Sequence, residues 1–135
     1  MQNLTFVLES CLKNTKEAVG AAAVDLESGL IIAVAHNVPY FTETYLDAVA
    51  AAAVDMFRGK TVSAVEKSLT ALRGHLVRNM IKEIQFATDG TYHFMTTSPA
   101  SPDLLVVLIT SRKADLTAGW TAVRSLLAAV IPLCP

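Results

Sequence analysis

The sequence predicts a single domain of the α+β class, with five short strands in a sheet that is flanked by helices. Two pairs of short apolar segments are each joined by a glycine-containing turn, the pattern of a β-hairpin. The segment Asp103–Val130 adds a near-continuous apolar run of strand length, followed by apolar residues at helical spacing. Because short connections make hairpin strands antiparallel, these pairs are expected to be antiparallel.

The N-terminal part of the chain predicts a helix and then the first hairpin. Apolar residues recur every three or four positions from Leu4 to Leu12, which predicts a short amphipathic helix that ends within 14–17. Two β-rich segments, 19–26 and 30–36, then flank a short connection that contains Gly29. Glycine adopts a positive φ at little cost, so the sequence predicts a hairpin here.

Two helices are predicted in the middle of the chain. The first runs from about Tyr45 to Phe57, with Thr42 or Thr44 as its N-cap, and is rich in alanine at its centre. Arg58-Gly59-Lys60 ends it. A second helix is predicted at about 62–74, or as far as Asn79, from the recurring apolar residues Val62, Val65, Leu69, Leu72 and Leu76. Ser63 and Glu66 have the spacing of a capping box for this helix.

The C-terminal part predicts a second hairpin, a buried strand and a covering helix. Segment 82–88 alternates polar and apolar residues, as a half-buried strand does. Asp89-Gly90 is a strong turn pair, and 92–97 is expected to return as the partner strand. Residues 98–102, with two prolines, are expected to form a loop. The apolar run 104–109 predicts a strand that is buried on both faces, and Leu116–Val130 predicts a helix that covers the sheet. This order of elements is that of a profilin-like or longin-like sandwich.

Composition excludes several classes of function. The chain has 135 residues and a formal net charge of −1, so no strong field favours nucleic acid or an anionic membrane. No run of 18 consecutive apolar residues and no signal-type N-terminus occur in it. With 53% hydrophobic and 17% charged residues, we expect a cytoplasmic protein that buries surplus apolar surface in an oligomer. Cys11 and Cys134 match no metal or redox spacing, and two free thiols are expected.

No recognisable set of catalytic, cofactor-binding or metal-binding residues occurs in the sequence. Gly59-Lys60-Thr61 matches only the end of a phosphate-binding loop and follows a helix instead of a strand. His36, His75 and His93 lie in three different predicted elements without ligand spacing. We therefore expect a non-enzymatic protein that binds other proteins, without a cofactor, a metal or nucleic acid.

Several segments, taken in order, resemble the roadblock (dynein light chain) family, especially its small bacterial members, over roughly Leu4 to Leu127. The resemblance is carried by residues 19–25 and 28–33 of the first hairpin, the alanine-rich helix, Asp89-Gly90, and the segments 104–109, 114–119 and 123–124. The chain differs from the family in a longer helical link at 58–80, and in Asp115 where the family has asparagine before the leucine of its last helix. The sequence is thus predicted to be one roadblock-like domain over 1–135.

The resemblance implies a five-stranded antiparallel sheet and a homodimer, joined through third strands into one ten-stranded sheet with the central helices packed across the two-fold axis. Family members act as scaffolds or regulators of Ras-like small GTPases, and some stimulate hydrolysis without supplying an arginine finger. Two features of the residues agree with a dimer: an edge strand with Ile84 and Phe86, and a helix of small residues. The predicted interface residues are Tyr45, Val49, Ala52, Ala53, Met56, Ile84, Phe86 and Thr88.

A different class of function stays open on the sequence. Related α+β sandwiches bind small ligands between the sheet and a helix, and four aromatic or imidazole side chains are candidates to line such a pocket. These are His36, Tyr40, Tyr92 and Trp120. The alternative prediction is therefore a small-ligand sensor. An enzyme ranks third, because no recognisable set of catalytic residues supports it.

Overall fold

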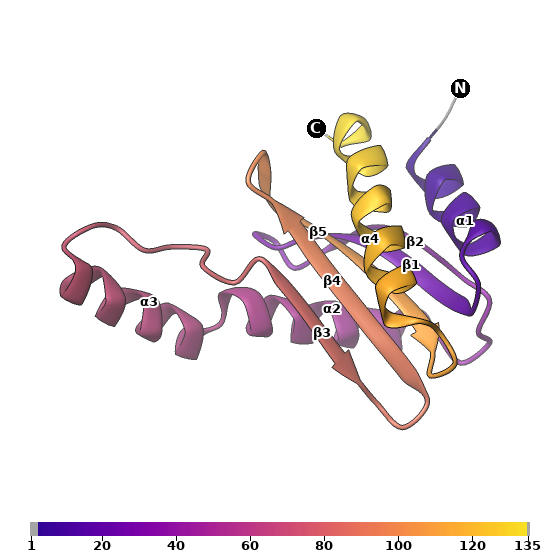
Figure 1. Cartoon of the computed structure of the whole chain (residues 1–135), viewed down its shortest axis with the longest axis horizontal. Coiled ribbons are helices and arrows are strands. Elements are labelled where there is room, and N and C mark those ends of the chain that lie inside the picture. Colours follow the sequence, from indigo (N-terminus) through magenta and orange to yellow (C-terminus); the bar gives the residue numbers. More distant parts are fainter. Residues whose placement is uncertain (1–2, 135) are drawn as a thin grey trace.

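One antiparallel sheet of five strands organises the structure, a computed structural model that describes residues 3–134 (Figure 1). The strands are β1 (Ala18–Asp25), β2 (Ile31–His36), β3 (Glu83–Ala87), β4 (Thr91–Ser98) and β5 (Ser101–Ser111). Their order across the sheet is β2-β1-β5-β4-β3. The predicted sheet, both hairpins and their antiparallel pairing are confirmed.

The central strand is β5, as the apolar run predicted. It pairs with β1 on one side and β4 on the other. Every residue from Leu104 to Thr110 is buried, so both faces of this strand lie in the core. This burial explains why the run shows no polar–apolar alternation.

Helices cover the sheet on both faces. They are α1 (Leu4–Asn14), α2 (Glu43–Arg58), α3 (Lys60–Arg73) and α4 (Leu116–Val130), followed by the 3₁₀ turn η1 (Ile131–Leu133). Residues of α1 and α4 share one core cluster with Phe94, Val106 and Leu108, whereas those of α2 share a second cluster with Met95 and Val107. Because alternate residues of β4 and β5 belong to different clusters, α1 and α4 lie on one face and α2 on the other.

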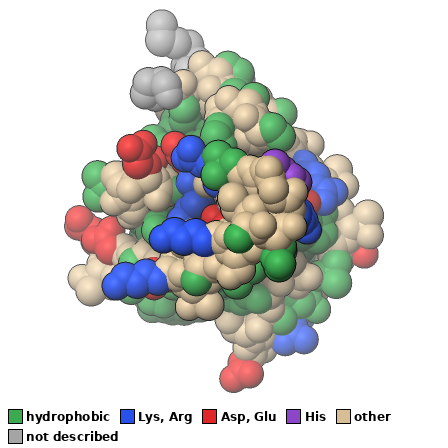
Figure 2. Space-filling view, turned by 90° about the vertical axis from the view of Figure 1, so that its left-hand side faces the viewer, with side chains coloured by type: hydrophobic (Ala, Val, Ile, Leu, Met, Phe, Trp, Pro, Cys, Tyr) green, Lys and Arg blue, Asp and Glu red, His purple; other side chains and the backbone are tan. Residues whose placement is uncertain are grey.

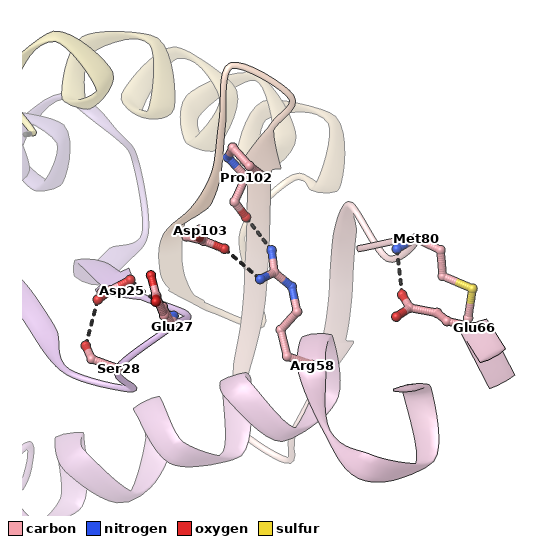
Figure 3. A network of polar contacts seen from close by, with 8 residues as sticks. All are labelled: Asp25, Glu27, Ser28, Arg58, Glu66, Met80, Pro102 and Asp103. Atoms are coloured by element: carbon pink, nitrogen blue, oxygen red, sulfur yellow. Dashed lines mark hydrogen bonds and ion pairs between the residues drawn. The ribbon is translucent and has the colours of Figure 1, made fainter. Parts of the chain in front are cut away.

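Local chemistry sets the ends of these elements. Gly29 has φ +76° in the first hairpin turn, and the Asp25 carboxylate accepts a 2.7 Å hydrogen bond from the Ser28 hydroxyl there. The Thr42 hydroxyl accepts from the Tyr45 amide at 3.2 Å and caps α2. Arg58, at the other end of α2, pairs with Asp103 at 2.7 Å and donates to the Pro102 carbonyl (Figure 3). The last contact fixes the end of α2 to the start of β5.

Two local predictions are wrong. Ser63 does not cap α3, because α3 already begins at Lys60 and the Ser63 amide bonds to the Gly59 carbonyl inside the helix. The segment 98–102 is not a loop, because β4 ends at Ser98 and β5 begins at Ser101, with only a two-residue turn between them. Pro102 thus lies within a strand, near its start, where a missing amide donor is tolerated.

One segment of the described chain, Leu116–Leu133, is long and apolar enough to cross a membrane by length and composition. It contains α4, whose apolar stripe of Gly119, Val123 and Leu126 is buried against the sheet. Arg124 on its outer side is paired with Glu83 of β3 at 2.7 Å, and the hydrogen bond from Arg124 lowers the pKa of the Glu83 carboxyl. These contacts are those of a helix that belongs to the core of the sandwich.

Candidate interaction surface

An apolar groove lies between α2 and the sheet, with a volume of about 230 Å³. The sheet contributes residues from every strand, among them Ala22, Ile31, Phe86, His93 and Val107. The α2 side contributes Tyr45, Leu46, Val49, Ala50, Ala52, Ala53 and Met56, and Phe41 from the preceding loop. Since almost all of these side chains are apolar, the groove suits an apolar partner far better than a polar substrate.

The structure brings the predicted interface residues together. Seven of the eight line the groove, namely Tyr45, Val49, Ala52, Ala53, Met56, Phe86 and Thr88. The eighth, Ile84, is half-buried and packs on the same core cluster. Ala53 is buried against the sheet, whereas Ala52 and Tyr45 are exposed, so only part of the set is available to a partner. That these residues form a dimer interface stays a prediction.

The groove opens beside an edge strand. Within the described sheet β3 pairs only with β4, so one side of β3 has no strand beside it. Ile84 and Phe86 point to the α2 face, and Glu83 points to the α4 face, where it meets Arg124. An edge with apolar residues and no covering element is a surface on which another strand can pair.

Small residues give α2 a smooth outer face. Ala48, Ala51 and Ala52 are exposed on it, while Ala50 and Phe57 are buried against the sheet. Alanine lets a neighbouring backbone approach closely, as at a symmetric contact between two helices. Together, α2 and β3 present a surface of small and apolar residues, and α2 also carries the exposed acidic residues Glu43, Asp47 and Asp55.

His93 is the buried polar group of the groove. Its ring stacks on Phe86 with 4.4 Å between ring centroids, and its Nε2 lies 3.1 Å from the Thr91 hydroxyl. Burial lowers the pKa of His93 to about 4, so the ring is neutral near pH 7. His93 is thus a packed histidine of the core.

This burial predicts a pH dependence of stability. The pKa of His93 is 6.5 in the unfolded chain and about 4 in the folded chain, so the unfolded chain binds more protons between these values. The free energy of unfolding should therefore fall as the pH drops from 6.5 toward 4, by about 2 kcal/mol after allowance for solvent screening.

Urea unfolding at pH 7.0 and pH 4.5 measures this loss, and His93→Phe is the comparison because it keeps the aromatic stacking but cannot titrate. Asp25 and Glu83, whose pKa values are lowered by hydrogen bonds, lose their contribution at lower pH in both proteins and cancel in the difference. An equal loss of stability in both proteins would show that His93 does not carry the effect.

The four side chains proposed for a small-ligand pocket do not come together. His36 lines the groove on the α2 face, and its ring lies 5.5 Å from that of Phe41. Tyr92 and Trp120 belong to the core on the opposite face, where both contact Phe94. Tyr40 is exposed in the loop before α2. The pocket as predicted is therefore wrong, although a different apolar groove exists.

Sequence reasoning missed Phe41 as a groove residue. Its ring is stacked on Tyr45 with 5.1 Å between centroids, and its side chain is buried. A signal was present, because an apolar residue just before the Thr42 cap and another at Leu46 have the spacing of a hydrophobic staple. Within residues 3–134 no group of three or more His, Cys, Asp or Glu side chains could hold a metal ion.

The fold and groove define a class of protein: a small α+β sandwich with an exposed edge strand beside an apolar helix. No protein-family model and no curated protein matches the chain. Solved structures do match. A roadblock/LC7 domain from Streptomyces avermitilis is 18% identical with a TM-score of 0.68, over 97% of this chain and 97% of that chain.

Two MglB structures also match. MglB of Myxococcus xanthus is 14% identical with a TM-score of 0.67, over 96% of this chain and 93% of that chain. An MglB with a tetrameric arrangement is 20% identical with a TM-score of 0.63, over 97% of this chain and 90% of that chain. The chain therefore has the roadblock/LC7 fold, and the resemblance stated from the sequence is confirmed at the level of the fold.

Proposed function

We propose that the chain is a non-enzymatic homodimeric scaffold or regulator, and that its partner is a Ras-like small GTPase or a larger protein complex. The observation that carries the dimer is the apolar groove, which opens beside the unpaired edge of β3. In this proposal two β3 strands pair across a two-fold axis into a ten-stranded sheet, and the two α2 helices cover each other's small residues. Such pairing removes an edge and buries apolar surface at once.

The oligomeric part of the proposal is supported by the likeness to an MglB with a tetrameric arrangement, since that protein shares this fold. The regulatory part is supported by the lining of the groove, which is almost entirely apolar and suits contact with another protein. A protein of this design works through the surface that its dimer presents to a partner.

Affinity capture from the native host tests the partner. The tagged protein is incubated with lysate that contains either GDP or a non-hydrolysable GTP analogue, and bound proteins are identified by mass spectrometry. We expect a Ras-like GTPase that prefers one nucleotide state. The Ile84→Lys variant, which should be monomeric, serves as bait to show whether capture needs the dimer. Repeated capture of no GTPase in either state would contradict this part of the proposal.

The groove also supports a second candidate, a module that binds a small apolar molecule. Its volume of about 230 Å³ is below the usual range for drug-sized ligands, and His93 and His36 are among the few polar groups in its lining. Native mass spectrometry separates the two functions. A retained small molecule on each chain favours the sensor, whereas an unliganded dimer favours the scaffold.

A further inference from the structure

A helical arm extends from the body of the sandwich. We define the α3 arm as residues 60–80, that is, α3 and the segment that returns toward β3. Figure 1 shows α3 extending away from the sheet on the side of β3, beyond the edge strand. Its main packing partner is α2, and only Gly59 separates the two helices in the sequence. The arm thus lies outside both core clusters and extends beyond the edge strand.

Internal hydrogen bonds give the arm a defined shape. The Glu66 carboxylate accepts a hydrogen bond from the Met80 amide at 2.8 Å (Figure 3). The Thr70 hydroxyl accepts one from the Val77 amide, also at 2.8 Å. Gly74 ends α3 with φ +74°, which turns the chain back. The Glu66 side chain is buried within the arm, where it makes the bond to Met80. The arm is therefore an ordered element, in which hydrogen bonds join α3 to the segment that returns toward β3.

The arm presents an apolar stripe to solvent. Val65, Leu72 and Leu76 are 44%, 83% and 70% exposed, so two of the most exposed large apolar side chains of the described chain lie here. A helix of this length is marginal in water without an apolar contact. Exposed cations, Lys67, Arg73 and Arg78, accompany the stripe. Figure 2, which views the molecule from this side, shows Lys and Arg side chains gathered among hydrophobic ones.

Acidic and basic residues are segregated along the sequence, and this pattern indicates which surface the arm can bind. Residues 17–57 contain six acidic residues, Glu17, Asp25, Glu27, Glu43, Asp47 and Asp55, and no Lys or Arg. Residues 58–82 contain six basic residues, Arg58, Lys60, Lys67, Arg73, Arg78 and Lys82, and only Glu66 as an acid. The arm is therefore complementary in charge to residues 17–57 of the same chain, of whose six acids three lie on α2, and complementary charges steer such surfaces together. Within one molecule the arm points away from that segment.

We propose that the α3 arm docks on a second copy of this chain, on the surface around Tyr40, Glu43 and Asp47. The inference rests on the proposed dimer. Two-fold pairing at β3 makes the α2 helices antiparallel, so an arm that continues past the C-terminal end of one α2 reaches the N-terminal end of the other. There the stripe meets Tyr40, which is 67% exposed, and the cations meet exposed carboxylates. Each chain of the dimer thereby clasps the other.

Dilution of the dimer, followed by sedimentation, tests the stripe. Leu72→Ser with Leu76→Ser should raise the dimer dissociation constant by at least about tenfold, since two apolar side chains lose a buried site. Leu30→Ser is the matched control, because Leu30 is 68% exposed in the first hairpin turn. Circular dichroism should show both variants folded. If the wild type is a dimer and the arm variant has the same dissociation constant, the proposed docking of the arm is wrong, but the proposed dimer stands. A wild-type monomer overturns both.

Charge exchange tests the docking surface. At low salt, Lys67→Glu and Asp47→Lys should each weaken the dimer by about threefold, and the double variant should recover most of the loss. Lys67→Glu with Glu9→Lys should show no recovery, because Glu9 lies on α1 at the other face of the sheet. Equal behaviour of the two double variants would overturn the proposed surface. Binding to vesicles rich in phosphatidylserine is a second test. If the wild type binds them and the leucine variant does not, while both have the same dimer affinity, the proposed docking surface is wrong.

Discussion

Replacing Gly119 by alanine is expected to destabilise the fold by about 2 kcal/mol, although alanine is the better helix former. A Cβ atom at Gly119 would lie 2.4 Å from Cζ of Phe94 and within 2.8 Å of two further ring atoms. Phe94 is fully buried in β4, and the Trp120 ring stands edge-on to it with 5.4 Å between centroids. The ring has no room to retreat, so α4 must shift away from the sheet or the ring must leave its rotamer.

Thermal unfolding measures this effect, with an expected fall of roughly 5–10 °C in Tm for a chain of this size. Ala118→Gly is the control for helix propensity, because Ala118 is exposed one position earlier on α4. Gly119→Ala combined with Phe94→Leu should lose less stability than the sum of the losses in the two single variants, since the smaller leucine side chain leaves space for the new methyl group. A Gly119→Ala protein at least as stable as the wild type would mean that the close approach of α4 to Phe94 is not required.

Replacing Ile84 by lysine is expected to abolish the proposed dimer while the monomer stays folded. Ile84 is half-buried at the α2 face of the edge strand, where a long side chain can extend its charge into water in the monomer. In a β3–β3 dimer the same position comes close to its symmetry mate, so two like charges would lie inside an apolar interface. Burial of unpaired charge costs several kcal/mol, which is enough to dissociate a dimer with an interface of ordinary size.

Ile32→Lys is the matched control for that experiment. Ile32 is also an isoleucine on an edge strand, β2, at the opposite side of the sheet, and it is 44% exposed. Both variants add the same charge to an edge, but only Ile84→Lys should change the mass in solution. A dimer that survives Ile84→Lys and dissociates with Ile32→Lys would place the interface at β2.

Much of the fold could be predicted because several elements carry strong local signals. The run 104–109 shows no alternation because both its faces are buried, and this burial placed β5 at the centre of the sheet. Gly29, which has φ +76°, and the turn pair Asp89-Gly90 marked the two hairpins. The bounds of α4 are those that the apolar spacing predicted.

Other features depend on three-dimensional context that one sequence does not display. Two prolines in 98–102 favoured a loop, but Pro102 lies near the start of β5, where it need not donate a hydrogen bond. Ser63 has capping-box spacing with Glu66, yet the helix begins earlier, and Glu66 bonds to Met80 across the arm. His93 is buried because helices cover both faces of β4 at this point, where His93, Phe94, Met95 and Thr96 are all buried.

The candidate site was predicted as a set of residue types and not as a shape. Small residues on α2 and apolar residues on β3 indicated a contact surface, whereas the groove between them exists only after the sheet has folded. The charge segregation between residues 17–57 and 58–82 is visible in the sequence. It acquires a meaning only when the structure shows the basic arm pointing away from the acidic segment (Figure 1).

The central claim is that this chain acts as a dimer built on β3 and α2. Light scattering coupled to size-exclusion chromatography, at micromolar concentration and near-physiological salt, tests it most directly. We expect a mass of twice the 14.4 kDa chain for the wild type, and a single-chain mass for Ile84→Lys. A wild-type mass of 14.4 kDa under these conditions would rule out the dimer.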